Sequence, residues 1–215
     1  MEDLALYLEK TCNMDIDHPT VLDVMKRLDL TDLSPEQKAM KIFYFVRDKC
    51  HYNMYATTGN LEAYKASAIL QSGEGWCLQK AVLFTALARA AGIPSRLIIV
   101  SIRNHKAPRE VWDVMGTNVF FPHAYNHLYL NGRWIKAAAT FDAAICKKIN
   151  VPIVEFDGTE DAILPQYDNE GKPYIEYLEE FGYHADVPWP LIMEKSREMY
   201  GEYHDRWLGD NTSNK

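Results

Sequence analysis

The chain has 215 residues, of which 47% are hydrophobic and 25% are charged, as is ordinary for a soluble globular protein. Acidic residues outnumber basic ones by 30 to 23, and the resulting net charge of −7 argues against a nucleic-acid-binding surface, which needs a basic field. No apolar run reaches the ~18 residues of a membrane-spanning helix.

The amino terminus has no basic leader followed by an apolar core, so we expect no secretory signal. The four cysteines, Cys12, Cys50, Cys77 and Cys146, form no Cys-x-x-Cys pair. Without an export signal, this usage indicates reduced thiols and a cytoplasmic protein.

The first ninety residues predict helices. The segment "HPTVLDVMKRL" is followed by "SPEQKAMKIFYFVRDKC", in which Ser34 is placed to cap a helix that begins at Pro35. A short helix, "EAYKASAILQSG", is expected to end at Gly73. The next, "WCLQKAVLFTALARAAGI", is apolar on nearly every side, which predicts a buried helix closed by Gly92 and Pro94.

The remainder predicts strands and turns. "SRLIIVSIR" is a β-branched run typical of a strand, residues 104–120 read as a surface loop, and "HAYNHLYLNGRWIKAAATFD" predicts a hairpin. "AAICKKIN" predicts a short helix, the following forty residues are rich in turns and acids, and a closing helix runs from Pro190 to about Trp207. Helices followed by an antiparallel sheet indicate the α+β class.

The stretch "GEGWCLQKA" places Cys77 in the first turn of the buried helix. The positive end of the helix dipole and the free backbone N–H groups favour a thiolate, which is the nucleophilic form of cysteine. The same N–H groups can stabilise an oxyanion on a substrate. The alternative interpretation is a small core cysteine, as we expect for the other three.

The hairpin distinguishes between its two histidines. With Asn131 and Gly132 in a two-residue turn, His123 lies opposite Thr140 and diagonal to Asp142. Diagonal residues lie ~7–8 Å apart, within reach of a side-chain hydrogen bond, so Asp142 is the predicted orienting group.

His127 instead lies opposite Lys136, where nothing could orient an imidazole, and is interpreted as a structural residue. On one strand His123 and His127 are ~13 Å apart, too far to bind one zinc ion, whose ligands lie within ~2.1 Å of it. We therefore expect no metal site.

A cysteine at a helix start, with a histidine and an aspartate on neighbouring strands, is typical of a thiol acyl-transfer site. In that interpretation Cys77 attacks a carbonyl, His123 takes and returns the proton, and Asp142 fixes the imidazole tautomer.

The residues from "ASAILQSGEGWCLQKAVLF" to "KAAATFD" resemble the core of the transglutaminase-like superfamily, which shares the papain-like cysteine protease fold. The resemblance spans about residues 40–142. It rests on Gly75 and Cys77, on the "ALARAAGIPSR" exit into a strand, on His123 and Tyr125, and on the Gly-x-Trp of the hairpin. It implies Cys77 as the nucleophile and His123 as its base.

The chain departs from the commonest family pattern, which has the acid four residues after the hairpin tryptophan, where this chain has Ala138. "KAAATFD" resembles a subgroup with a Lys-Ala-x-x-x-Phe-Asn/Asp hairpin exit, which would suit Asp142. Thr140 is the alternative partner of His123.

Three other residues are candidates near the site. Trp76 could line a substrate pocket or simply pack under the helix start, and Tyr52 or Tyr55 could donate to an oxyanion. The acidic turn "FDGTEDA", with Asp157, Glu160 and Asp161, lacks the ligand spacing of a calcium loop and is interpreted as solvated.

We therefore expect one papain-like domain over residues 1–215, with a core at about 35–142 and residues 143–215 packed on it. Its N-terminal helices and a central buried helix pack on an antiparallel sheet. The expected function is thiol-dependent hydrolysis of, or acyl transfer from, a peptide or amide bond in a peptide or protein substrate, without a cofactor, nucleic acid or membrane. The alternatives are a catalytically retired scaffold that binds peptides and a thioester-dependent acyltransferase.

Overall fold

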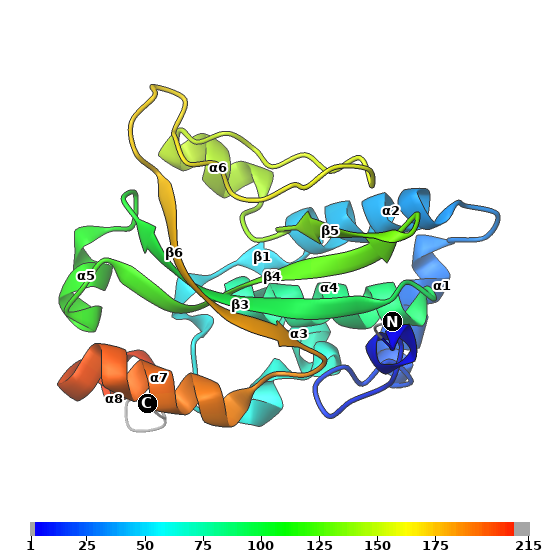
Figure 1. Ribbon diagram of the computed structural model, residues 1–215, viewed down its shortest axis with the longest axis horizontal. Helices are drawn as coiled ribbons and strands as arrows, with labels where there is room; N and C mark the ends of the chain where they lie inside the picture. Colours follow the sequence, from blue (N-terminus) through cyan, green and yellow to red (C-terminus); the bar gives the residue numbers. More distant parts are fainter. Residues whose placement is uncertain (1–2, 209–215) are drawn as a thin grey trace.

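The centre of the protein is a four-stranded antiparallel sheet, seen in a computed structural model that describes residues 3–208 (Figure 1). The strand order is β5-β4-β3-β6. The strands are β3 (Ser95–Asn104), β4 (Val119–Leu130), β5 (Arg133–Ala137) and β6 (Ile175–His184). Together with the helices that cover it, this antiparallel sheet makes an α+β architecture, as the sequence predicts.

Helix α4 (Cys77–Ala90) is the central helix, and thirteen of its fourteen residues are buried. It packs on β3 and β4, and other helices cover its remaining sides because an apolar surface on every side must be removed from water. The covering helices are α1 (Pro19–Leu28), α2 (Pro35–Lys49) and α3 (Ala66–Ser72).

The helix termini follow the predicted signals. The Ser34 side chain accepts from the Gln37 N–H in a capping box, with Pro35 as the first helical residue of α2. Gly73 ends α3 with φ of 71°, in the left-handed region that glycine adopts without a steric penalty. Gly73 therefore ends α3 four residues before Cys77, where the next helix begins.

The hairpin has the predicted register. Asn131 and Gly132 both have positive φ, as a type I′ turn requires, and Leu130 pairs with Arg133. The ladder ends, however, with Asn126 opposite Ala137. Beyond that point the chain leaves β4, and the Ala138 N–H donates to the Ala162 carbonyl at 2.8 Å.

The segment after the hairpin supplies part of the sheet itself. Strand β6 pairs along the length of β3, so the residues expected to pack on a finished core form its fourth strand. The closing helix is broken at Gly201 into α7 (Trp189–Tyr200) and α8 (His204–Trp207), and α7 packs on β4.

Shorter elements complete the fold. A helix, α5, lies within the stretch expected to be a loop, and the short helix expected after the hairpin is α6. Their bounds are α5 (Arg109–Met115) and α6 (Ala143–Ile149), with a two-stranded parallel sheet of β1 (His51–Tyr52) and β2 (Glu74–Gly75) and single 3-10 turns at Leu4–Tyr7, Met54–Ala56, Leu61–Tyr64 and Gly201–Tyr203. No helix among residues 3–208 is long and apolar enough to cross a membrane.

One buried lysine joins α4 to α2. The Lys80 ammonium donates to the carbonyl oxygens of Val46 at 2.9 Å and Arg47 at 3.0 Å, and also to that of Cys50. These are carbonyls at the C-terminal end of α2, which have no partner within the helix. Burial lowers the pKa of Lys80 to about 8.

Replacing Lys80 with methionine should destabilise the fold by about 3 kcal/mol, because it leaves buried carbonyls without a donor. Urea unfolding of Lys80→Met measures the loss. Lys49→Met, at an exposed position in the last turn of α2, is the matched control and should change the free energy of unfolding by less than about 0.5 kcal/mol. Equal stabilities of the two variants would contradict this role for Lys80.

Candidate active site

The candidate nucleophile lies at the first residue of α4. Strand β2 leads into the helix, and Gly75 is paired with Tyr52 of β1. A Cβ at Gly75 would lie 2.9 Å from the Cβ of Gln79, so only glycine fits without a shift. The Gln79 side chain in turn accepts from the Trp76 N–H at 3.2 Å, which closes the turn that presents Cys77.

The Cys77 thiol contacts β4 at the two residues that flank His123. Its Sγ donates to the Pro122 carbonyl oxygen at 3.7 Å, and the Ala124 backbone N–H points toward it. The structure therefore brings together two segments that are more than forty residues apart in the sequence. Within the described residues, no hydrogen bond joins the Cys77 and His123 side chains directly.

Burial controls the protonation of Cys77. The side chain is 6% exposed, and desolvation raises its pKa to about 12 although the N–H groups of Ala124, Leu78 and Cys77 itself lower it. The expectation that the helix start would favour a thiolate is therefore wrong for this conformation. The favourable dipole is present, but the cost of burying the charge exceeds it.

His123 is a buried, neutral imidazole. It is 2% exposed, burial lowers its pKa to about 3, and its Nε2 has no hydrogen-bond partner in the described part of the chain. Its ring centroid lies 6.3 Å from that of Tyr125 and 6.2 Å from that of Tyr177. A neutral imidazole has one ring nitrogen that can accept a proton, as a general base requires.

Asp142 does not form the predicted bond with His123. One carboxylate oxygen accepts from the Ile145 N–H at 2.9 Å, as the N-cap of α6, and the other accepts from the Tyr52 N–H at 3.0 Å. The expected diagonal requires the β4–β5 ladder to continue, and this ladder ends at Ala137. For the same reason Thr140, although buried, is not paired opposite His123.

The other candidates differ in how they are placed. Tyr52 is paired with Gly75, two residues before Cys77, and burial raises the pKa of its hydroxyl well above the usual value. Trp76 is buried and packs with its ring centroid 6.4 Å from that of Tyr64, whereas Tyr55 is 67% exposed. Tyr52 is therefore the oxyanion candidate that the structure supports best.

His127 occupies a packed site on the sheet. Its Nδ1 accepts from the Arg96 Nε at 3.3 Å, and its ring stacks on Tyr183 with 5.5 Å between centroids. Lys136 is its cross-strand partner, as expected from the register. These contacts agree with a structural histidine.

Comparisons with known proteins place this fold in a family. A family model described as the transglutaminase-like superfamily matches residues 23–139, which is more than half of the chain. The chain belongs to the transglutaminase-like superfamily. Among curated proteins, none matches it.

One similar solved structure is that of a putative cysteine protease from Cytophaga hutchinsonii. It has 18% sequence identity to this chain and a TM-score of 0.50. The match covers 86% of this chain but only 55% of that protein, so this chain spans little more than half of the other's length. At this identity the likeness concerns the fold.

Two tyrosines beyond the region matched to the transglutaminase-like superfamily reach the site. Tyr177 of β6 packs beside His123, and burial raises the pKa of its hydroxyl. The Tyr200 hydroxyl of α7 accepts from the Phe121 N–H at 2.6 Å and donates to the Phe121 carbonyl oxygen at 3.0 Å. Phe121 directly precedes Pro122, whose carbonyl oxygen contacts Cys77. No motif marks either tyrosine in the sequence.

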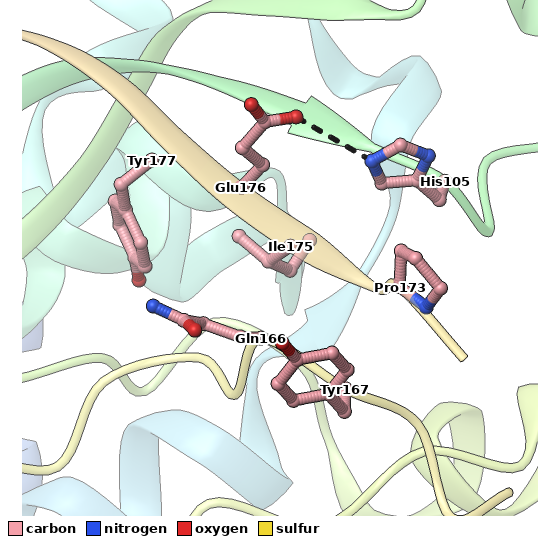
Figure 2. Close-up of a pocket in the computed structure, with 7 residues that line it drawn as sticks. All are labelled: His105, Gln166, Tyr167, Pro173, Ile175, Glu176 and Tyr177. Carbon is pink, nitrogen blue, oxygen red and sulfur yellow. Dashed lines mark ion pairs between the residues drawn. The ribbon is translucent and has the colours of Figure 1, made fainter. Parts of the chain in front are cut away.

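Tyr177 also lines a surface pocket of about 400 Å³ (Figure 2). In this pocket His105 Nε2 lies 3.6 Å from a carboxylate oxygen of Glu176.

No cluster of three or more His, Cys, Asp or Glu side chains within residues 3–208 could bind a metal ion. In the acidic turn, the Asp157 carboxylate accepts from the N–H groups of Thr159 and Glu160.

The depressed pKa of His123 predicts a stability that falls in acid. The ordinary pKa of histidine is 6.5, so below pH 6.5 the unfolded chain takes up a proton at His123 that the folded protein excludes until about pH 3. The contribution of neutral His123 to the free energy of unfolding is therefore complete above pH 6.5 and is lost as the pH falls. Between pH 7.5 and 5 the loss should be about 2 kcal/mol.

Urea unfolding at the two pH values measures this loss. His123→Gln should reduce the pH dependence by about 2 kcal/mol, whereas His51→Gln, at an exposed position, should leave it unchanged. An identical pH dependence in the wild type and His123→Gln would show that His123 is not buried in its neutral form.

Proposed function

We propose that the protein is a thiol-dependent hydrolase or acyl transferase that acts on peptide or amide bonds, with Cys77 as nucleophile and His123 as general base. The observation that supports this proposal is the contact of the Cys77 thiol with the backbone on both sides of His123, whose Nε2 has no hydrogen-bond partner among residues 3–208. Membership of the transglutaminase-like superfamily and the likeness to a protein titled a cysteine protease agree with it.

The proposed reaction has two steps. The proton of Cys77 passes to His123 as the sulfur attacks the substrate carbonyl, and the resulting oxyanion accepts from the N–H groups at the start of α4. His123 then protonates the leaving amine as the C–N bond breaks, which leaves a thioester on Cys77. Water or a second amine attacks that thioester and restores the thiol.

Because both groups are neutral and buried in this conformation, the proton transfer has to occur with the substrate bound. Without substrate, the apolar surroundings disfavour the charged thiolate and imidazolium, whereas the polar carbonyl of a bound substrate stabilises them. The site is thus expected to show little reactivity toward small alkylating reagents and more toward peptides.

Cys77→Ala should abolish turnover, and His123→Ala should reduce it by about 10²–10⁴-fold, the usual contribution of a general base. The assay is mass spectrometry of a proteome-derived peptide library, with a fluorescent primary amine added to detect acyl transfer as well as hydrolysis. His127→Gln should retain activity, since its contacts are structural. An equal loss in His127→Gln and His123→Ala, at matched stability, would show that His127 is the base.

A catalytically retired scaffold that binds peptides is the second candidate function. Ala138 takes the place of the family's usual acid, and no described hydrogen bond links Cys77 to His123. A wild-type protein that neither cleaves the library nor incorporates the amine, but still binds peptides, would favour this candidate.

Asp142→Asn separates a catalytic role of the carboxylate from its structural one. Asparagine is as good an N-cap as aspartate, so α6 should persist while the negative charge is lost. We expect turnover to change by less than about threefold, in keeping with the bonds to Tyr52 and Ile145. A loss of about tenfold or more with an unchanged melting temperature would instead make Asp142 the orienting residue.

A further inference from the structure

A second pocket has a volume of about 340 Å³. Tyr52 and Phe141 line it, with their ring centroids 4.5 Å apart. Tyr52 is paired with Gly75, two residues before Cys77. Tyr52 therefore connects the lining of this pocket to the strand that leads into Cys77.

The lining of the pocket is apolar and contains no acid. Its apolar part includes Met54, Pro108, Ile145 and Ile149. None of the lining residues is Asp or Glu, although the chain as a whole carries 30 acidic and 23 basic residues. This composition suits an aliphatic or aromatic side chain.

Two lysines give the pocket its charge. Lys106 is neutralised by Asp168, with 2.5 Å between the Nζ and a carboxylate oxygen. Lys148 lines the pocket, is exposed, and has no ion pair in the described part of the chain. Among the described residues that line the pocket, Lys148 is therefore the lysine without an acidic partner, and its charge is complementary to a carboxylate on the ligand.

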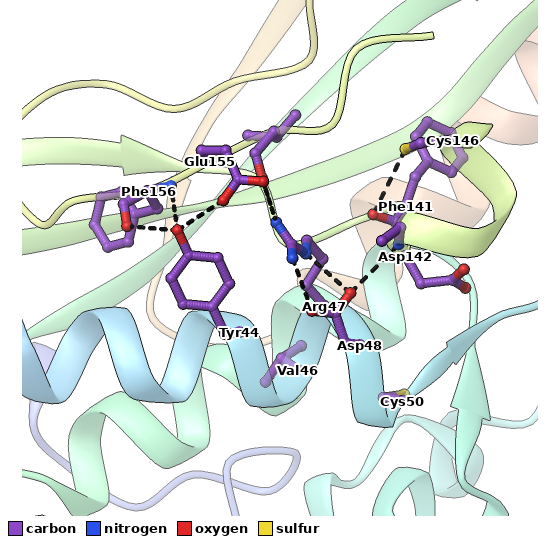
Figure 3. A network of polar contacts seen from close by, with 12 residues as sticks. Tyr44, Val46, Arg47, Asp48, Cys50, Phe141, Asp142, Cys146, Glu155 and Phe156 are labelled. Atoms are coloured by element: carbon purple, nitrogen blue, oxygen red, sulfur yellow. Dashed lines mark hydrogen bonds and ion pairs between the residues drawn. The ribbon is translucent and has the colours of Figure 1, made fainter. Parts of the chain in front are cut away.

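The helix that carries Lys148 is fixed to the rest of the protein at its start. Asp142 caps α6, and the Asp48 carboxylate accepts from the Ala143 N–H at 3.3 Å (Figure 3). Asp48 is in turn paired with the Arg47 guanidinium at 2.8 Å. Lys148 is thus presented on an ordered element, which lowers the entropic cost of binding.

We propose that this pocket is a substrate subsite, which takes an apolar side chain of a peptide while Lys148 binds a carboxylate on the neighbouring residue or at the peptide's C-terminus. This inference rests on the proposed function at Cys77 for the catalytic use of the site, but peptide binding can be measured without turnover. The preferred substrate class is therefore a peptide with an apolar residue next to a negative charge.

Binding is tested first, with the Cys77→Ala protein on an array of fluorescein-labelled peptides. The array varies one position between Leu and Ala and its neighbour between Glu and Gln, with either a free or an amidated C-terminus. We expect Leu to bind at least about tenfold tighter than Ala. A carboxylate should increase the affinity by about threefold. Comparing Glu with Gln, and the free with the amidated C-terminus, shows whether the side chain or the C-terminus supplies that carboxylate.

Lys148→Glu in the same background tests the charge. It should remove the preference for the carboxylate, whereas Lys147→Glu, an exposed neighbour on α6 that does not line the pocket, should retain it. Equal effects of the two variants would reduce the preference to general electrostatics and overturn the subsite. Affinities that depend on neither the apolar residue nor the carboxylate would also overturn the subsite.

Cleavage by the protein with Cys77 intact separates this inference from the proposed function. Peptides that bind with the expected preference but are neither cleaved nor coupled to an amine would refute the catalytic proposal and leave the subsite. Turnover whose cleavage sites show no apolar or acidic preference, unchanged by Lys148→Glu, would refute the subsite and leave the catalytic proposal.

Discussion

The architecture depends on the burial of a helix that is apolar on nearly all sides. Helix α4 can be removed from water only if a sheet covers one side and other helices cover the rest, so α1, α2 and α3 pack around it. Lys80 is the one lysine on this helix, and the carbonyls at the end of α2 take up its three donors. The same packing brings the N-terminus of α4 against β4, and the candidate active site is a consequence of that contact.

The burial that builds the site also suppresses its reactivity. Desolvation acts in opposite directions on the two groups, since it raises the pKa of Cys77 and lowers that of His123. Both effects keep the proton on sulfur. Tyrosines from three separate elements, Tyr52, Tyr177 and Tyr200, lie around the thiol and contribute to this exclusion of water. A resting cysteine in such surroundings is protected from oxidation and from stray electrophiles.

Local signals made much of the fold predictable from the sequence. The capping serine at Ser34, the Asn-Gly turn and the glycine at Gly73 each act within a few residues, and each has the expected effect. The proximity of Cys77 to the strand of His123 also followed from pattern. The partner of Asp142 could not be predicted in this way, because it depends on where the β4–β5 ladder ends. The ladder ends where the Ala138 N–H donates to the carbonyl of Ala162, which lies 24 residues further along the chain. Tyr200 likewise reaches β4 through tertiary packing alone.

The position of β6 has a consequence for how this superfamily is divided into folding units. The family match ends at residue 139, yet the outer edge of β3 is covered by a strand that begins at Ile175. A fragment cut at the family boundary would expose the N–H and C=O groups along most of a long, apolar strand. Such an edge is a template for strands of other molecules, and the fragment would be prone to aggregation. The region that the family model matches is therefore shorter than the length of chain needed to pair both edges of β3.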